Sequence, residues 1–127
     1  MEGTPKPREG SLKGYLFKDA KKNKVFVTDK PQPGAKTCQT NYITLAKKDG
    51  LSLVECELIT GRTHQIRVQF ASRKLPLVGD RKYGGKQTGV PLCLWSCSLS
   101  FPHPVTGKLL SFAQDAPWLE EWDKWFT

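Results

Sequence analysis

With 127 residues, the chain is long enough for one domain with its own hydrophobic core. Hydrophobic residues make up 38% and aromatic residues 10%, which argues against a disordered chain, and no apolar run is long enough to span a bilayer. The net charge of +8 favours contact with polyanions such as nucleic acid, with a basic surface that has no specific partner as the alternative.

The N-terminal segment has no feature of a signal peptide. Its first eight residues, MEGTPKPR, lack an apolar stretch, so a cytoplasmic location is the default expectation. Because proline, glycine and charged residues dominate residues 1–11, we predict an irregular lead-in there.

The four cysteines are expected to be buried, reduced thiols rather than metal ligands or disulfides. No Cys-x-x-Cys motif occurs, only two histidines are present, and nothing suggests secretion. They are Cys38, Cys56, Cys93 and Cys97.

The first half of the chain predicts β-strands. Residues 24–28 form a short β-prone run, and a loop rich in proline and glycine follows it over residues 29–36. Residues 39–45 and 51–58 are both β-prone, and the second run alternates apolar with polar side chains over most of its length. The Asp49-Gly50 pair between them predicts an antiparallel hairpin.

After Gly61 the period changes to that of a helix, which we predict over residues 63–73, before Pro76. A glycine-punctuated loop follows over residues 79–85; its spacing fits no phosphate-binding motif, so we interpret the glycines as positions of positive φ.

The last third of the chain predicts a hairpin and a helix. Residues 92–101 are expected to form a long strand with an apolar face, and residues 109–113 a returning strand after a turn at 103–108 that contains His103. A helix is predicted over residues 117–126. The fold class is therefore α+β, a mainly antiparallel mixed sheet with one central and one C-terminal helix. The apolar face of the long strand comprises Cys93, Trp95, Cys97, Leu99 and Phe101.

The segment from Thr60 to Val68 concentrates polar residues at the start of the central helix. A strand that turns through Gly61 into a helix brings free backbone N–H groups together, and Arg62 and Arg67 add positive charge. Such a site suits a phosphate or a carboxylate. The alternative is that both arginines are solvated. His64 suggests a general base, but a capping or packing residue on the apolar face fits it as well.

The run LITGRTHQIRV at 58–68 resembles the signature of the RluA-type RNA pseudouridine synthases. Four further runs resemble blocks of the same family in the same order, so the resemblance covers nearly the whole chain. They lie at residues 35–42, 76–84, 99–104 and 112–118.

The resemblance implies part of the synthase catalytic fold and a cofactor-free isomerisation of uridine to pseudouridine in ribosomal or transfer RNA. In this family an aspartate attacks a nucleoside that has been flipped out of the RNA stack, and the base detaches, rotates and rejoins through carbon. By resemblance, Arg67 forms the salt bridge to this aspartate and Ile66 packs against the uracil pocket. Arg62, His64 and Gln65 would support the site or bind the RNA.

The family's nucleophile lies in a His-Arg-Leu-Asp motif, which this sequence lacks. Asp80 belongs to a different block and is not assigned that role. We therefore interpret residues 1–127 as the C-terminal portion of a catalytic domain that is inactive alone, with a non-catalytic basic RNA-binding module as the alternative. An incomplete sheet would leave an edge and apolar surface open to self-association or to the missing N-terminal half.

Overall fold

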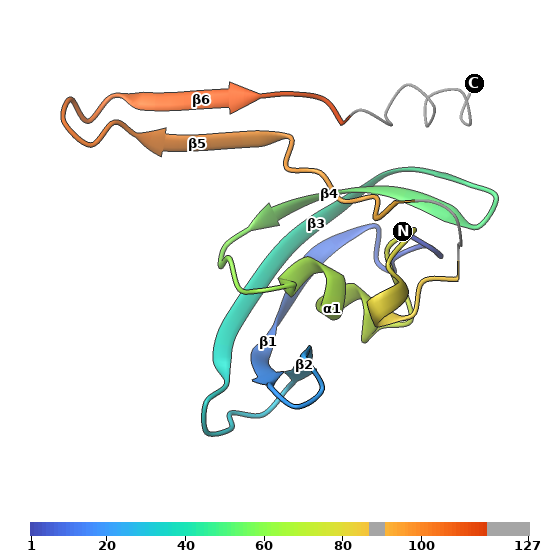
Figure 1. Ribbon diagram of the computed structural model, residues 1–127. Coiled ribbons are helices and arrows are strands. Elements are labelled where there is room, and N and C mark those ends of the chain that lie inside the picture. The colour runs from blue at the N-terminus through green and yellow to red at the C-terminus, as the bar shows by residue number, and fades with distance from the viewer. Residues whose placement is uncertain (87–90, 117–127) are drawn as a thin grey trace. The chain divides into compact units, whose positions relative to one another are not determined.

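The computed structural model describes residues 1–86 and 91–116, and the chain divides into two compact units, residues 1–92 and residues 93–127. The first unit contains a four-stranded sheet and a short helix, and the second contains a two-stranded hairpin (Figure 1). Within the described ranges, none of the helices has both the length and the apolar character needed to cross a membrane.

The sheet of the first unit is antiparallel throughout, in the order β2-β1-β3-β4. Its strands are β1 (Glu9–Asp19), β2 (Lys24–Thr28), β3 (Lys36–Lys48) and β4 (Leu51–Leu58). Side chains along β3 alternate between buried and more exposed positions, as expected when one face of a strand lies on a core. The antiparallel α+β class predicted from the sequence is confirmed for this part of the chain.

The predicted hairpin between β3 and β4 is also confirmed. Asp49 and Gly50 form its two-residue turn with φ values of 52° and 78°, and Lys48 pairs with Leu51. Two successive left-handed residues match the twist of the flanking strands, which explains the choice of an Asp-Gly pair.

The central helix α1 spans Gln65–Ala71 and is shorter than the predicted 63–73. At its start, His64 adopts a left-handed conformation with φ of 53°, which prevents the helix from beginning earlier. At its end, Lys74 is also left-handed, and the N–H of Leu75 donates to the carbonyl of Phe70 at 3.0 Å. This is the Schellman arrangement that commonly closes a helix.

The core lies between α1 and the face of the sheet that the helix covers (Figure 1). Phe70 is 1% exposed and meets the ring of Tyr42 edge-on, with the ring centroids 5.6 Å apart. Val68, two residues before Phe70, packs with Val25 of β2 and with Cys38 of β3. The helix is therefore fixed on the sheet by its own apolar side chains, which sets the position of the polar residues that share it.

The irregular lead-in predicted for residues 1–11 is wrong at its end, because β1 already begins at Glu9. The residues before it are also engaged: the amino group of Met1 donates to the carbonyl of Ser52 at 2.7 Å, and Glu2 bridges Leu51. The rest of β1 was not predicted as a strand either.

The second unit pairs β5 (Ser98–Pro102) with β6 (Leu109–Ala113). The returning strand and the turn are as predicted, and Gly107 of the turn has φ of 72°. The long strand predicted over 92–101 is confirmed only from Ser98 onwards, since residues 91–97 form no regular element. The five residues of β6 pair with the five residues of β5, so no partner strand extends the pairing to residues 91–97. The predicted helix at 117–126 lies outside the described residues.

The four cysteines are reduced thiols, as predicted, but they are not all buried. Cys38 is buried, Cys56 and Cys93 are partly buried, and Cys97 is exposed. The exposure of Cys97 follows from the late start of β5 at Ser98, because the residue lies in the irregular segment before that strand.

Candidate functional site

The polar segment between β4 and α1 is organised around the buried amide of Gln65. The Gln65 oxygen accepts hydrogen bonds from the Thr60 hydroxyl at 2.7 Å and from the Arg62 backbone N–H at 3.0 Å. The Gln65 nitrogen donates to the Gln39 carbonyl and to the Thr40 hydroxyl, both at 2.9 Å. At 2% exposed and with its amide fully used, Gln65 shapes the loop and has no group left for RNA.

The expected cluster of free N–H groups at the helix start is therefore only partly present. Arg62 donates its backbone N–H to Gln65, and Gln65 donates its own to the carbonyl of Arg62 at 3.1 Å. The Arg62 residue is exposed and its side chain donates through Nε to the Thr37 carbonyl at 3.0 Å, and its terminal nitrogens are bonded to no group in the described part of the chain.

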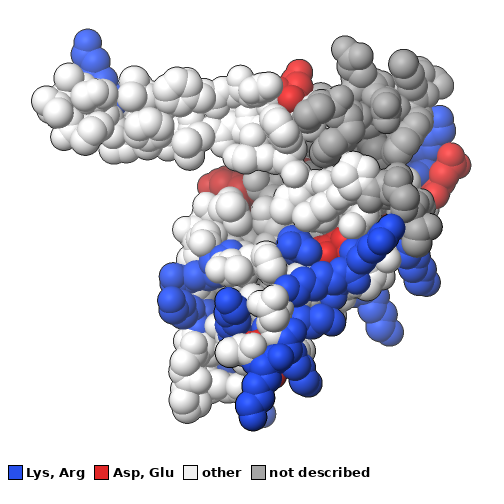
Figure 2. Space-filling model, viewed as in Figure 1, with Lys and Arg blue, Asp and Glu red and all other residues white. Residues whose placement is uncertain are grey.

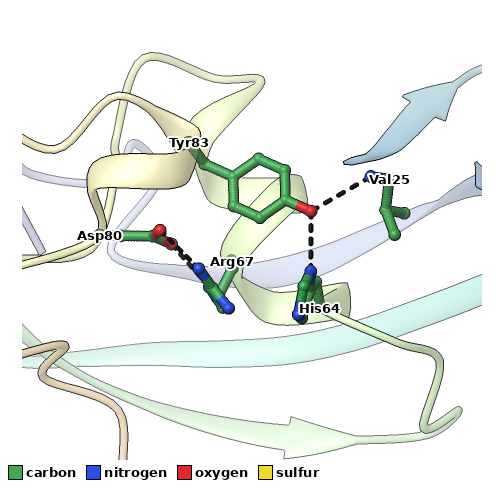
Figure 3. Close-up of polar contacts among 5 residues, drawn as sticks. All are labelled: Val25, His64, Arg67, Asp80 and Tyr83. Carbon is green, nitrogen blue, oxygen red and sulfur yellow. Dashed lines mark hydrogen bonds and ion pairs between the residues drawn. The ribbon is translucent and has the colours of Figure 1, made fainter. Parts of the chain in front are cut away.

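Arg67 is held by a two-point ion pair with Asp80 (Figure 3). Nε lies 2.9 Å from one carboxylate oxygen of Asp80, and Nη2 lies 2.8 Å from the other. The Asp80 side chain is 0% exposed and that of Arg67 is 17% exposed. The hydrogen bond with Asp80 raises the pKa of the Arg67 guanidinium above its usual value. A fork of this kind fixes the plane of the guanidinium and leaves Nη1 outside the pair.

The glycine-rich loop around the 3-10 helix η1 (Arg81–Tyr83) places Asp80 in this buried position. Gly79 has φ of 82°, and a Cβ on it would collide with the carbonyl group of Pro91. Gly85 donates its N–H to the Asp80 carbonyl at 2.7 Å, and a Cβ there would lie 2.9 Å from that same oxygen. The prediction of positive φ is confirmed for Gly79 and Gly84. In this structure the loop positions the carboxylate of Asp80 against Arg67.

Tyr83 links three elements beside this ion pair. Its ring lies 5.1 Å from the Arg67 guanidinium, within the range of a cation–π contact. Its hydroxyl accepts a hydrogen bond from the Val25 backbone N–H at 3.1 Å and lies 2.8 Å from Nδ1 of His64. Figure 3 shows the Tyr83 hydroxyl directed at His64, and with the Arg67 contact to the Tyr83 ring the three side chains form one cluster.

Burial lowers the pKa of His64, and the positive charge of Arg67 and Lys82 lowers it further. The imidazole is therefore neutral near pH 7. Its backbone is left-handed, a conformation that costs a non-glycine residue about 1 kcal/mol and is retained at functional sites.

The structure brings Arg67 and His64 together through Tyr83, but it separates Ile66 and Gln65 from them. Ile66 is partly buried against the core cluster around Phe70. Sequence reasoning missed Asp80 and Tyr83 as site residues. The signal that could have found them is a loop in which three glycines surround one acid and one aromatic residue.

A separate cavity of about 440 Å³ lies away from this cluster, among residues before β1 and the side chains of Tyr42, Phe70 and Arg73. Its lining includes neither Arg67 nor His64, so the geometry of the cluster, and not the size of a cavity, identifies the candidate site.

Comparisons with known proteins agree with the resemblance. Residues 3–72 match the family described as RNA pseudouridylate synthase. The chain is 36% identical over 112 residues to an uncharacterized RNA pseudouridine synthase of Bacillus subtilis, covering 86% of this chain and 36% of that protein. It is 36% identical over 97 residues to the ribosomal large subunit pseudouridine synthase D of Neisseria meningitidis, covering 66% of this chain and 26% of that protein.

Among solved structures, the chain resembles the human protein RNA Pseudouridylate Synthase Domain Containing 4, with a TM-score of 0.72 and 21% identity. The match covers 91% of this chain and 55% of the human one, and it supports the fold. The chain spans about a third of the length of the curated relatives it matches.

Proposed function

This chain belongs to the RluA-type RNA pseudouridylate synthase family, and on that premise we propose that it is the C-terminal portion of a catalytic domain that isomerises uridine to pseudouridine in ribosomal or transfer RNA. In this proposal Arg67 binds the nucleophilic aspartate of the family, which must come from a segment that carries the His-Arg-Leu-Asp motif. A cytoplasmic location is part of the same proposal.

The observation that carries the proposal is the unused edge of the Arg67 guanidinium. The Asp80 fork occupies Nε and Nη2, while neither hydrogen of Nη1 is bonded to a group of residues 1–86 or 91–116, which leaves both for a second carboxylate. Because the fork and the Tyr83 ring fix the guanidinium plane, a nucleophile bound at Nη1 would be held in one orientation.

Asp80 is unsuited to be the nucleophile itself. Its side chain is 0% exposed, and each of its oxygens is bound to Arg67, so neither can reach a nucleoside. The negative charge of Asp80 also offsets the positive charge of Arg67. Arg67 would therefore orient a second carboxylate mainly through directed hydrogen bonds. Without the aspartate motif, the chain alone is expected to have no isomerase activity.

A second candidate is a non-catalytic RNA-binding module, and the distribution of charge favours it. Within residues 93–127 the sequence has only Lys108 and Lys124 as Lys or Arg, so nearly all of the positive charge lies in the first unit. Figure 2 shows many Lys and Arg side chains over the visible face of that unit. Such a surface binds the phosphate backbone without reading sequence.

The hairpin unit supports a proposal about partners. Leu99 and Phe112 are each 59% exposed, and Phe101 is 38% exposed. Apolar side chains at such exposure favour self-association or contact with the rest of the synthase fold.

The experiment is tritium release from RNA labelled at carbon 5 of uridine, measured with the chain alone and with the chain mixed with a polypeptide that carries the aspartate motif. We expect background release from the chain alone, and release from the mixture that is lost with Arg67→Lys. Turnover by the chain alone contradicts the proposed need for a second segment. Salt-dependent RNA binding without release from the mixture favours the binding module.

A further inference from the structure

We infer that the Tyr83 hydroxyl holds His64 as the neutral tautomer with its proton on Nε2, so that His64 donates a hydrogen bond to a phosphate oxygen of bound RNA and does not act as a general base. This inference rests on the proposed function and deepens it, because it names the donor atom and the ligand group at the same site.

The geometry around the Tyr83 hydroxyl selects this tautomer. The hydroxyl oxygen accepts the Val25 N–H at 3.1 Å and has one proton of its own to donate. In the described part of the chain, the acceptor within reach of that proton is Nδ1 of His64, at 2.8 Å. If Nδ1 carried a proton instead, it would donate to the hydroxyl and leave the hydroxyl proton without an acceptor. A neutral imidazole that accepts at Nδ1 carries its proton at Nε2.

Burial and the charges around the ring keep it neutral. Burial is the main effect that disfavours a proton on His64, and Arg67 of α1, Lys82 of η1 and Lys18 of β1 add to it. Asp80 alone acts in the opposite direction, and its oxygens are engaged by Arg67. With Nδ1 committed to Tyr83 and Nε2 already protonated, the ring has no lone pair with which to remove a proton from a substrate.

Positively charged side chains surround the ring, and its free edge has no partner among the described residues. Figure 3 shows the second ring nitrogen of His64 directed away from Tyr83, and no group of residues 1–86 or 91–116 is hydrogen-bonded to it. The same cations that exclude a proton from the ring attract a phosphate. Their sign favours the RNA backbone over a neutral uracil carbonyl as the acceptor.

The tautomer can be measured without activity by ¹⁵N NMR of the full chain labelled at histidine. The chain offers an internal reference, because Nδ1 of His103 accepts backbone N–H groups from Val105 at 3.1 Å and Thr106 at 3.2 Å. We expect a pyridine-type signal at Nδ1 and a pyrrole-type signal at Nε2 for both histidines at neutral pH. Tyr83→Phe should give a mixture of tautomers at His64 and leave His103 unchanged. A pyrrole-type signal at Nδ1 of His64, or a charged ring, overturns the inference.

The ligand is tested by titrating the labelled chain with an oligouridylate and, separately, with uridine. The Nε2 signal of His64 should shift on addition of the oligonucleotide and not on addition of the nucleoside. A shift with uridine would contradict a phosphate as the acceptor and would identify the nucleoside as the group that His64 binds. His64→Gln keeps an N–H donor and should retain most of the RNA affinity, while His64→Leu should lose about tenfold. If the parent chain binds no RNA, the proposed RNA contact and the phosphate ligand both fail, whereas the NMR signals still decide the tautomer.

Discussion

Arg67 and Asp80, thirteen positions apart in the sequence, form an ion pair in which a fully buried carboxylate engages two nitrogens of one guanidinium. The pair joins the helix to the glycine-rich loop, so it supports both the fold and the candidate site. Because Arg67 and Asp80 differ in exposure, replacing one or the other should lower the free energy of unfolding by different amounts.

We expect Arg67→Met to destabilise the chain more than Asp80→Asn. The first leaves a carboxylate with 0% exposure and no partner, at a cost of about 5 kcal/mol, while the second leaves a guanidinium that is 17% exposed and partly hydrated, at a cost of about 3 kcal/mol. Urea unfolding of both single variants and the double variant measures this. The double variant should cost less than the sum, and additive effects would show that the pair is not coupled.

Gly79→Ala is expected to destabilise the chain by about 2 kcal/mol or more. Gly79 has φ of 82°, and a Cβ would collide with the Pro91 carbonyl group, so both the backbone and the loop must shift. Gly61→Ala is the matched control, because no atom lies within 4 Å of its added Cβ and its φ is not in the left-handed region. That control should change the free energy of unfolding by less than about 1 kcal/mol. Equal losses in the two variants would contradict the role assigned to the loop.

The parts of the fold that local sequence signals determine were predicted correctly, and those that depend on distant partners were not. The Asp49-Gly50 turn and the alternation after it are sufficient to define the β3–β4 hairpin. In contrast, β1 contains Gly10 and Gly14, which interrupt its apolar pattern. Their purpose is visible only in the sheet, where a Cβ on Gly10 would crowd the Tyr42 ring at 3.3 Å.

In the candidate site, too, residues marked by a local sequence signal were predicted and residues that depend on distant contacts were not. Arg67 and His64 could be selected from the sequence because they lie in one dense polar run. Asp80 and Tyr83 were missed: the glycines around them mark an unusual loop, but their contact with Arg67 and His64 depends on how the loop at 79–85 folds back on α1. Gln65 was predicted to contact RNA since it lies in the same run, but the side-chain direction that buries it depends on the sheet.

Lowering the pH from about 6.5 to 5 should reduce the stability of the parent chain through His64. Because the pKa of His64 is lowered in the folded state, the unfolded chain binds more protons below the ordinary histidine pKa of about 6.5. The free energy of unfolding therefore falls as the pH drops through this window, and the loss levels off below the folded-state pKa. His64→Gln should give a flatter profile in urea unfolding at a series of pH values. An identical profile would show that His64 does not contribute.

Thiol labelling should distinguish the four cysteines. Cys97 is exposed and should react first with iodoacetamide at pH 8. Burial raises the pKa of the Cys56 thiol to about 11 and also raises that of Cys38, so both carry little of the reactive thiolate at this pH. Peptide mass spectrometry after timed quenching gives the order, and labelling in urea serves as the control in which all four react. Early modification of Cys38 in the folded chain would contradict its burial.

The hairpin unit is expected to drive concentration-dependent self-association through one of its two faces. Leu99 pairs with Phe112 and Phe101 with Leu110, which places these four apolar side chains on one face, while the paired Ser100 and Ser111 lie on the other. Leu99→Lys with Phe112→Glu should therefore shift light scattering towards the monomer. Ser100→Lys with Ser111→Glu introduces the same charge pair on the serine face and should leave the association unchanged. If the parent chain is monodisperse as a monomer at all concentrations, or if both variants respond alike, the apolar face is not the contact.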